Sequence, residues 1–350
     1  MGTKSTISVR ILVFIWLASA VRVEAQVWTN SKEAENFQKL VASGKSEQAI
    51  KQLRAFVAKS PEDADARLLL SSILIAKGTP PGCAPIVACA KAWLGAELSI
   101  PKEDLSEATE HAQAAVRLAP HNADAASLLG LSLARAGKLE EGAKQLRRAL
   151  EIEPETAGTH LQLGWIFNRA RQPDAAIPEL SKALELDPKD GLAWLELGYS
   201  YHLKNDLGKS IEASRKSIEL NGGSEGAYRN LCAIYTDRNE YEQLVESCEA
   251  VVRLSPNDAR TWNILAWSYA TAVDARFKNP ARALAYAQKA VSLTGEKNAG
   301  ILDTLAEAYY VNANYDRAIA TEKKALALDP ANESFKKSIE RYQQAKQSKR

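Results

Sequence analysis

The stretch that decides the fold is GLAWLELGYSYHLKND, residues 191–206. Its large apolar residues Trp194, Leu197 and Tyr201 recur at intervals of three and four, the spacing of one face of an α-helix. Gly198 stands among them and would let a second helix approach closely. The polar residues 204–206 are typical of a turn. The stretch therefore predicts a helix that packs against a neighbour and ends in a short turn.

The same arrangement returns along the chain with a period of 34 residues. Triplets that are typical of helix ends close with proline or glycine at this spacing: Pro120, Pro154, Pro188, Gly222 and Pro256. Similar endings at Pro61, Gly295 and Pro330 extend the series towards both ends. Two amphipathic helices fit within each period. A repeat of this length predicts a solenoid of stacked helix pairs.

Composition agrees with an all-α protein. The chain of 350 residues is 46% hydrophobic and 25% charged, which is typical of a globular protein rather than a disordered or membrane one. Aromatic residues make up only 7%, and alanine is abundant, which favours helix over sheet.

These repeats resemble the tetratricopeptide repeat. In that family the first helix carries Trp-x-x-Leu-Gly-x-x-Tyr, and the second carries small residues ahead of a closing proline. Residues 194–201 fit the first-helix pattern fully. Close matches are Leu129-Gly130-Leu133, Leu163-Gly164-Phe167, Trp262-Leu265-Ala266-Tyr269 and Leu302-Leu305-Ala306-Tyr309. The resemblance implies a right-handed superhelical solenoid of about eight antiparallel helix pairs, from about Asn30 to Asn332.

Two repeats are longer than the others. Twenty-five extra residues between Pro61 and Pro120 predict an insert at about 78–103, a structured loop with a short helix near 88–98. Five extra residues are placed in the segment 271–279.

Two further features differ from the regular repeat: the packing of one second helix and the end of the chain. Ser210, Ser214 and Ser217 stand where small or apolar residues are usual, so we expect that second helix to pack less tightly. Residues 333–350 predict a capping helix with a basic tail, whose apolar side would cover the last repeat. Its apolar residues are Phe335, Ile339 and Tyr342, with Asn332 as the helix cap.

The first 25 residues resemble a secretory signal peptide. Lys4 and Arg10 precede an apolar run at 11–21, and small residues suit cleavage near Ala25. The alternative is an uncleaved anchor, but this run is well short of the roughly 20 residues that span a bilayer. We expect residues 26–332 to form the solenoid of an exported protein, periplasmic or secreted, without stable membrane insertion.

Charge argues against a nucleic-acid partner. Beyond residue 25 the chain has 42 basic and 42 acidic side chains, so it has no net positive field for a phosphate backbone.

No catalytic or metal motif is evident in the sequence. Gly44-Lys45-Ser46 and Gly208-Lys209-Ser210 lack the earlier glycine and preceding strand of a phosphate-binding loop, and we interpret both as turns. The four histidines, at 111, 121, 160 and 202, lack zinc-ligand spacing. We expect no metal, no cofactor and no enzymatic activity.

The four cysteines suit two disulfides in an exported chain. Cys232 replaces the glycine of a first helix, and the family resemblance places Cys248 opposite it across the helix crossing. Cys83 and Cys89 share the insert. The alternative is four buried free thiols.

The resemblance also implies a concave groove lined by the second, fifth, ninth, twelfth and thirteenth residues of each first helix. The candidate groove residues are Trp165, Tyr199, Trp267, Tyr310, Arg135, Arg169, Arg229 and Arg260. Alternatively, the aromatic side chains fill space between adjacent first helices. The lysine and asparagine pattern of the family's carboxylate clamp is missing, so we do not expect a bound chain terminus.

The function expected is therefore that of an exported, non-catalytic protein-interaction scaffold. Its ligand would be an extended or helical segment with apolar anchors and some acidic residues. The alternatives are a structural subunit of a cell-envelope assembly, or an enzyme with a site at the 78–103 insert.

Overall fold

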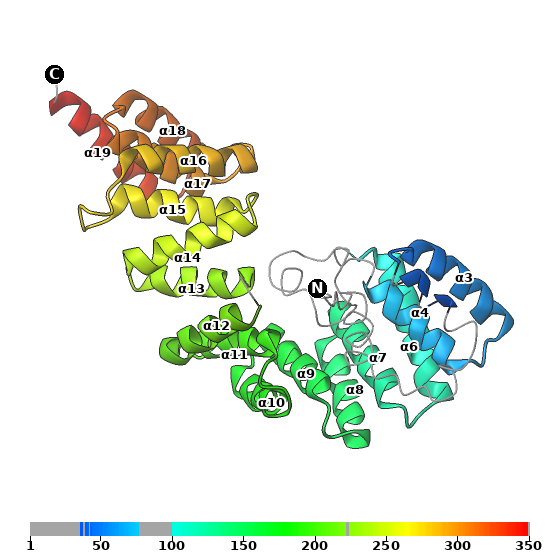
Figure 1. Cartoon of the computed structure of the whole chain (residues 1–350). Coiled ribbons are helices and arrows are strands. Elements are labelled where there is room, and N and C mark those ends of the chain that lie inside the picture. Colours follow the sequence, from blue (N-terminus) through cyan, green and yellow to red (C-terminus); the bar gives the residue numbers. More distant parts are fainter. Residues whose placement is uncertain (1–35, 38, 42, 77–99, 222–223, 349–350) are drawn as a thin grey trace, which may run out of the picture. The chain divides into compact units, whose positions relative to one another are not determined.

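The computed structural model describes residues 36–37, 39–41, 43–76, 100–221 and 224–348 (Figure 1). These residues fall into two compact units, divided in the sequence between Gly226 and Ala227, and each unit is described by itself. All regular structure in the described residues is helical, so the all-α prediction is confirmed.

Unit 1 consists of helix pairs. Its helices are α3 (Ser46–Lys59), α4 (Ala64–Ala76), α6 (Lys102–Leu118), α7 (Ala123–Arg135), α8 (Leu139–Ile152), α9 (Ala157–Arg169), α10 (Pro173–Leu186), α11 (Gly191–Leu203) and α12 (Leu207–Asn221). The first helices α4, α7, α9 and α11 each pack against the second helix that follows, and each pair packs on the next.

Unit 2 continues the pattern. Its helices are α13 (Glu225–Asp237), α14 (Tyr241–Leu254), α15 (Ala259–Thr271), α16 (Pro280–Thr294), α17 (Ala299–Val311), α18 (Tyr315–Leu328) and α19 (Glu333–Ser348). Helix α19 packs against α18 and buries Phe335 and Tyr342, as the predicted capping helix should. Asn332 accepts a hydrogen bond from the Ser334 amide at 3.1 Å. Among the described helices none is both long and apolar enough to cross a membrane.

The starts of α11 and α15 are fixed by an aspartate that closely follows the closing proline. Asp190 accepts hydrogen bonds from two amides in the first turn of α11, and Asp258 does the same for α15. The indole N–H groups of Trp194 and Trp262 then donate to the carbonyls of the prolines six residues earlier, at 3.0 and 2.9 Å. The repeated tryptophan thus ties the helix to its preceding turn.

Glycine is required where the two helices of a pair cross. A Cβ atom built on Gly164 would lie 2.5 Å from Cγ of Leu180 in α10, and one built on Gly130 would lie 2.8 Å from the Gly142 carbonyl oxygen. By contrast, a Cβ atom on Gly158, in the first turn of α9, would meet nothing within 4 Å.

Two substitutions in α9 should therefore change stability in opposite directions. Gly164→Ala should destabilise the protein by about 1–3 kcal/mol because the methyl group overpacks the crossing. Gly158→Ala should stabilise it by about 0.5 kcal/mol because alanine is the better helix former. Urea unfolding followed by circular dichroism measures both. Equal effects of the two variants would show that the crossing tolerates a side chain.

The prediction of loose packing in α12 is wrong. Ser210, Ser214 and Ser217 are all fully buried. The hydroxyls of Ser210 and Ser217 donate to the carbonyl oxygens of Gly198 and Gly191 in α11, each at 2.7 Å. These hydrogen bonds replace the apolar contacts of the other pairs, and small serine side chains allow an equally close approach.

The structure describes the extra residues of one of the two longer repeats and only the end of the insert in the other. The five extra residues lie between α15 and α16, in the segment 272–279, as predicted. The larger insert lies between α4 and α6, and its predicted limit of Glu103 is slightly late because α6 begins at Lys102. The signal peptide, the helix predicted at 88–98, and the cysteines at 83 and 89 lie outside the described residues.

Candidate protein-interaction surface

The predicted groove aromatics differ in accessibility. Trp165, the ninth residue of α9, is only 7% exposed, and the Arg169 guanidinium lies 5.4 Å from the centre of its ring. This burial favours the alternative in which Trp165 fills space between helices. Tyr199, at the same position of α11, is half-buried.

Tyr310 is covered by the capping helix. Its ring stacks on that of Tyr342, with centres 4.8 Å apart and planes 29° apart. The Arg341 guanidinium lies 4.8 Å from the centre of the Tyr310 ring and pairs with Glu307, the ninth residue of α17. At the last repeat, α19 thus occupies groove positions that an external ligand would need.

Trp267 is the accessible member of the set. It is the ninth residue of α15, and 42% of its surface is exposed. Arg260 and Thr271 lie on the same face of the helix, seven residues before it and four after it. Trp267 is therefore the most exposed of the predicted groove aromatics, and a partner could reach its ring without displacing α19.

The four predicted arginines also differ. Burial lowers the pKa of Arg135 to about 10, and its Nη1 donates to the Ile75 carbonyl oxygen at 3.3 Å. Arg229 pairs with Asp258, the cap of α15. Arg260 is exposed and forms no ion pair with a described side chain. Arg169 lies over the Trp165 ring, so three of the four arginines make contacts within the protein.

The sequence analysis missed a buried polar cluster between α9 and α11. The Asn168 amide nitrogen donates to the carboxylate of Glu196 at 2.8 Å and to its backbone carbonyl at 2.9 Å. The Ser200 hydroxyl donates to the Asn168 amide oxygen at 2.6 Å. Burial raises the pKa of Glu196 to about 7, although the hydrogen bond from Asn168 opposes this shift. Glu196 stands between Leu195 and Leu197, so a charged residue within an apolar run was the available signal.

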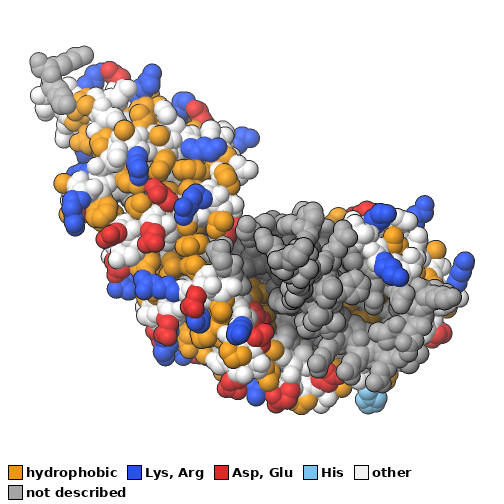
Figure 2. Space-filling model, in the orientation of Figure 1, with side chains coloured by type: hydrophobic (Ala, Val, Ile, Leu, Met, Phe, Trp, Pro, Cys, Tyr) orange, Lys and Arg blue, Asp and Glu red, His pale blue; other side chains and the backbone are white. Residues whose placement is uncertain are grey.

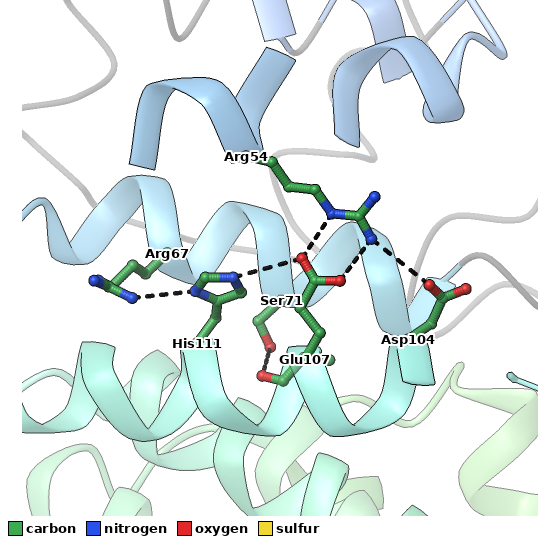
Figure 3. Close-up of polar contacts among 7 residues, drawn as sticks. Arg54, Arg67, Ser71, Asp104, Glu107 and His111 are labelled. Carbon is green, nitrogen blue, oxygen red and sulfur yellow. Dashed lines mark hydrogen bonds and ion pairs between the residues drawn. The ribbon is translucent and has the colours of Figure 1, made fainter. Parts of the chain in front are cut away.

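A second polar network joins α3, α4 and α6 (Figure 3). Arg54 donates to both carboxylate oxygens of Glu107, at 2.7 and 2.5 Å, and lies 3.8 Å from Asp104. Nδ1 of His111 accepts from Arg67 at 3.2 Å, so the ring proton is on Nε2, which lies 3.7 Å from Glu107. Burial and the Arg67 charge lower the pKa of His111. This network braces the repeat that contains the insert.

Ser71 lies close to this network but is not activated by it. Its hydroxyl donates to the Ala108 carbonyl oxygen at 2.8 Å, while both ring nitrogens of His111 face Arg67 and Glu107 (Figure 3). A nucleophilic serine would need the histidine as its hydrogen-bond acceptor. Within the part of the chain that the structure describes, no group of three potential ligands could hold a metal ion.

The structure joins Cys232 in α13 to Cys248 in α14 by a disulfide, with Cα atoms 5.0 Å apart. Both cysteines are buried. They occupy the crossing that glycine and leucine form in α9 and α10, where Gly164 faces Leu180. A covalent bond thus stands where other repeats rely on close packing.

Surface charge on the visible face is mixed. Lysine and arginine side chains are interspersed with aspartate and glutamate over the described helices, without a large patch of one sign (Figure 2). The described residues on this face thus show no extended cationic track of the kind that binds a phosphate backbone.

The helix pairs have a regular length, and a glycine or another small residue lies where the two helices cross. These features define an α-helical repeat protein. A family model of the tetratricopeptide repeat matches residues 36–82, 102–157 and 161–225. The chain belongs to the tetratricopeptide repeat family.

Solved structures agree with this fold. The Cut9–Hcn1 hetero-tetramer of APC/C matches with a TM-score of 0.57 and 14% identity, covering 95% of this chain and 59% of that one. PilF of Pseudomonas aeruginosa gives 0.53 and 22% identity, covering 63% and 96% of the two chains. PilW, a type IV pilus biogenesis factor, gives 0.51 and 15%, covering 62% and 98%. A comparison with curated protein sequences finds no significant match.

Proposed function

We propose that this protein is a non-catalytic interaction scaffold that binds an extended or helical segment of a partner protein on the first helices of unit 2. The observation that carries the proposal is the exposed ring of Trp267 at a groove position of α15. Exposed aromatic side chains are enriched among the residues that dominate binding energy at protein interfaces. Membership of a family of interaction repeats supports the same role.

Several features support binding rather than chemistry. Nε2 of His160 donates to the Pro154 carbonyl oxygen at 3.0 Å, and its Nδ1 lies 2.7 Å from the Glu179 carboxylate. His111 belongs to the network with Arg54 and Glu107, so both histidines serve structure. We propose that the protein needs no cofactor and no metal for its function, and that its partner is a protein rather than a nucleic acid. The mixed surface charge supports the second point.

Replacing Trp267 should weaken binding without unfolding the protein. Trp267→Ala should reduce the affinity for a partner captured by crosslinking about thirtyfold, because loss of an aromatic anchor costs about 2 kcal/mol. Leu328→Ala is the matched control, since Leu328 is 50% exposed on α18 but lies outside the groove positions. Titration calorimetry measures both affinities, and circular dichroism checks the fold. A partner bound equally well by the Trp267 variant and the parent would exclude this site.

We also propose that the protein is exported, to the periplasm or outside the cell. The leader-like residues 1–25 and the disulfide between Cys232 and Cys248 both support an oxidising compartment. Mass spectrometry of the protein isolated from its native compartment should find Gln26 as the first residue. Protein that begins at Met1 and stays in the membrane fraction would contradict export.

A further inference from the structure

Exposed apolar side chains are concentrated at one place in unit 2. Among the described residues the large apolar side chains that are exposed are Trp267, Val273 and Leu328. Two of these three are six residues apart, and Val273 is the most exposed of them at 90%. Val273 belongs to the segment 272–279, which connects α15 to α16. The corresponding turns after α13 and α17 have only three residues. The longer segment is thus the feature that separates this repeat from its neighbours.

The segment 272–279 has a defined structure. The Phe277 ring stacks on that of Tyr241 at the start of α14, with centres 5.8 Å apart and planes 22° apart. The Asn279 amide donates to the Tyr269 carbonyl oxygen at 3.1 Å, and the Phe277 amide donates to the Asp274 backbone carbonyl oxygen at 3.0 Å. These contacts leave the folded segment presenting Val273 outward. An open hollow of about 630 Å³ lies beside it, bordered by Tyr241 and Phe277.

Helix geometry places Trp267 and Val273 within reach of one short ligand. Four residues of helix followed by two extended residues span at most about 13 Å. Arg260 lies two turns before Trp267 on the same face, about 10 Å away. The surface from Arg260 through Trp267 to Val273, here called the α15 surface, is therefore at most about 23 Å long. An extended segment of about seven residues would cover it.

Charge indicates the chemistry of the ligand. Arg260 at the start of the α15 surface and Lys278 in the segment 272–279 are exposed, and neither forms an ion pair with a described side chain. The acidic side chains beside Val273 interact with Arg276. The Asp274 carboxylate accepts hydrogen bonds from the Arg276 guanidinium at 2.6–3.2 Å, and the charge of Glu242 further raises the pKa of Arg276. These two cations are thus available to an acidic partner, while Trp267 and Val273 offer apolar contacts.

We infer that the α15 surface binds an extended acidic segment of a partner protein, with two apolar side chains placed on Trp267 and Val273 and acidic residues beside Arg260 and Lys278. This inference rests on the proposed function and adds the segment 272–279 to the site. The ion pairs with Arg260 and Lys278 would lie in solvent because both side chains are exposed, so binding should weaken as ionic strength rises. The apolar contacts supply affinity, and the charges select the partner.

Two pools of synthetic peptides of about nine residues test the inference on the full chain. Every peptide carries two leucines at varied spacing, flanked by glutamate in one pool and by lysine in the other. Fluorescence polarisation should detect binding of the acidic pool. Val273→Asp and Trp267→Ala should each weaken it about tenfold, whereas Leu328→Asp should not. Arg260→Glu combined with Lys278→Glu should reverse the preference in favour of the basic pool.

The outcomes separate this inference from the proposed function. If the captured partner loses affinity with Trp267→Ala but not with Val273→Asp, the groove assignment stands and the role of segment 272–279 is wrong. If neither change weakens the partner, both proposals fail. A parent protein that prefers the basic pool, or binds neither pool, overturns the inference about the acidic segment.

Discussion

Glu196→Gln should remove a large part of the pH dependence of stability in unit 1. The carboxyl of Glu196 is fully buried, and its pKa rises to about 7 from an ordinary value of about 4.3. Between these two pH values the folded state holds a proton that the unfolded state has lost. Stability is therefore greatest below about pH 4.3 and falls by about 3 kcal/mol as the pH rises through 7.

The glutamine side chain imitates the protonated carboxyl. It keeps an oxygen that accepts from Asn168 but carries no charge at any pH, so the variant should be more stable than the parent at pH 8 and similar at pH 5. Urea unfolding across this range measures the difference. Glu151→Gln, which changes an exposed glutamate of α8, should leave the pH dependence unchanged. Parallel pH profiles for parent and Glu196→Gln would show that the carboxyl is ionised in the folded state.

A second buried carboxyl shows the same behaviour in unit 2. Glu322 in α18 is fully buried, and its pKa is raised by burial and by the neighbouring Asp303 carboxyl. Nearby, Glu307 accepts a hydrogen bond from the Tyr342 hydroxyl at 2.9 Å and pairs with Arg341. The capping helix α19 thus packs near acidic side chains, and the charge of one of them, Glu307, is compensated by Arg341. The contribution of Glu322 to stability should therefore be larger at acid pH, as for Glu196 in unit 1.

The repeat architecture could be predicted from the sequence because its cause is local. The period of 34 residues sets the lengths of the helices and turns, and glycines such as Gly164 mark the crossings where a side chain would clash. The segment 272–279 followed from simple counting of residues between helix ends. Each of these features depends on residues close together in the chain.

The accessibility of the groove residues could not be predicted in the same way. Trp165 and Trp267 share the ninth position of their helices, yet their exposed fractions are 7% and 42%. Helical spacing assigns a residue to a face, but its depth depends on side chains of neighbouring repeats, such as Arg341 over Tyr310. The serines of α12 show a related limit. Their hydroxyls find helix carbonyl acceptors only once the crossing has formed.

Removing the bond between Cys232 and Cys248 should lower the stability of unit 2 by about 3 kcal/mol. The two cysteines are 16 residues apart, and a bridge that closes a loop of about this length restricts the unfolded chain by that amount. Cys232→Ala combined with Cys248→Ala tests this loss by urea unfolding. Non-reducing peptide mapping of the parent should show the two cysteines linked, and it also tests the pairing of Cys83 with Cys89, which stays a prediction.

A second double variant separates the bond from the packing. Cys232→Gly combined with Cys248→Leu rebuilds the crossing of Gly164 and Leu180 without a bridge. Burying the leucine should restore part of the lost stability, because a fully buried leucine contributes about 2 kcal/mol. The alanine variant should therefore be the least stable of the three proteins. Stability that is unchanged in the alanine variant, or free thiols at both positions in the parent, would show that α13 and α14 are held by packing alone.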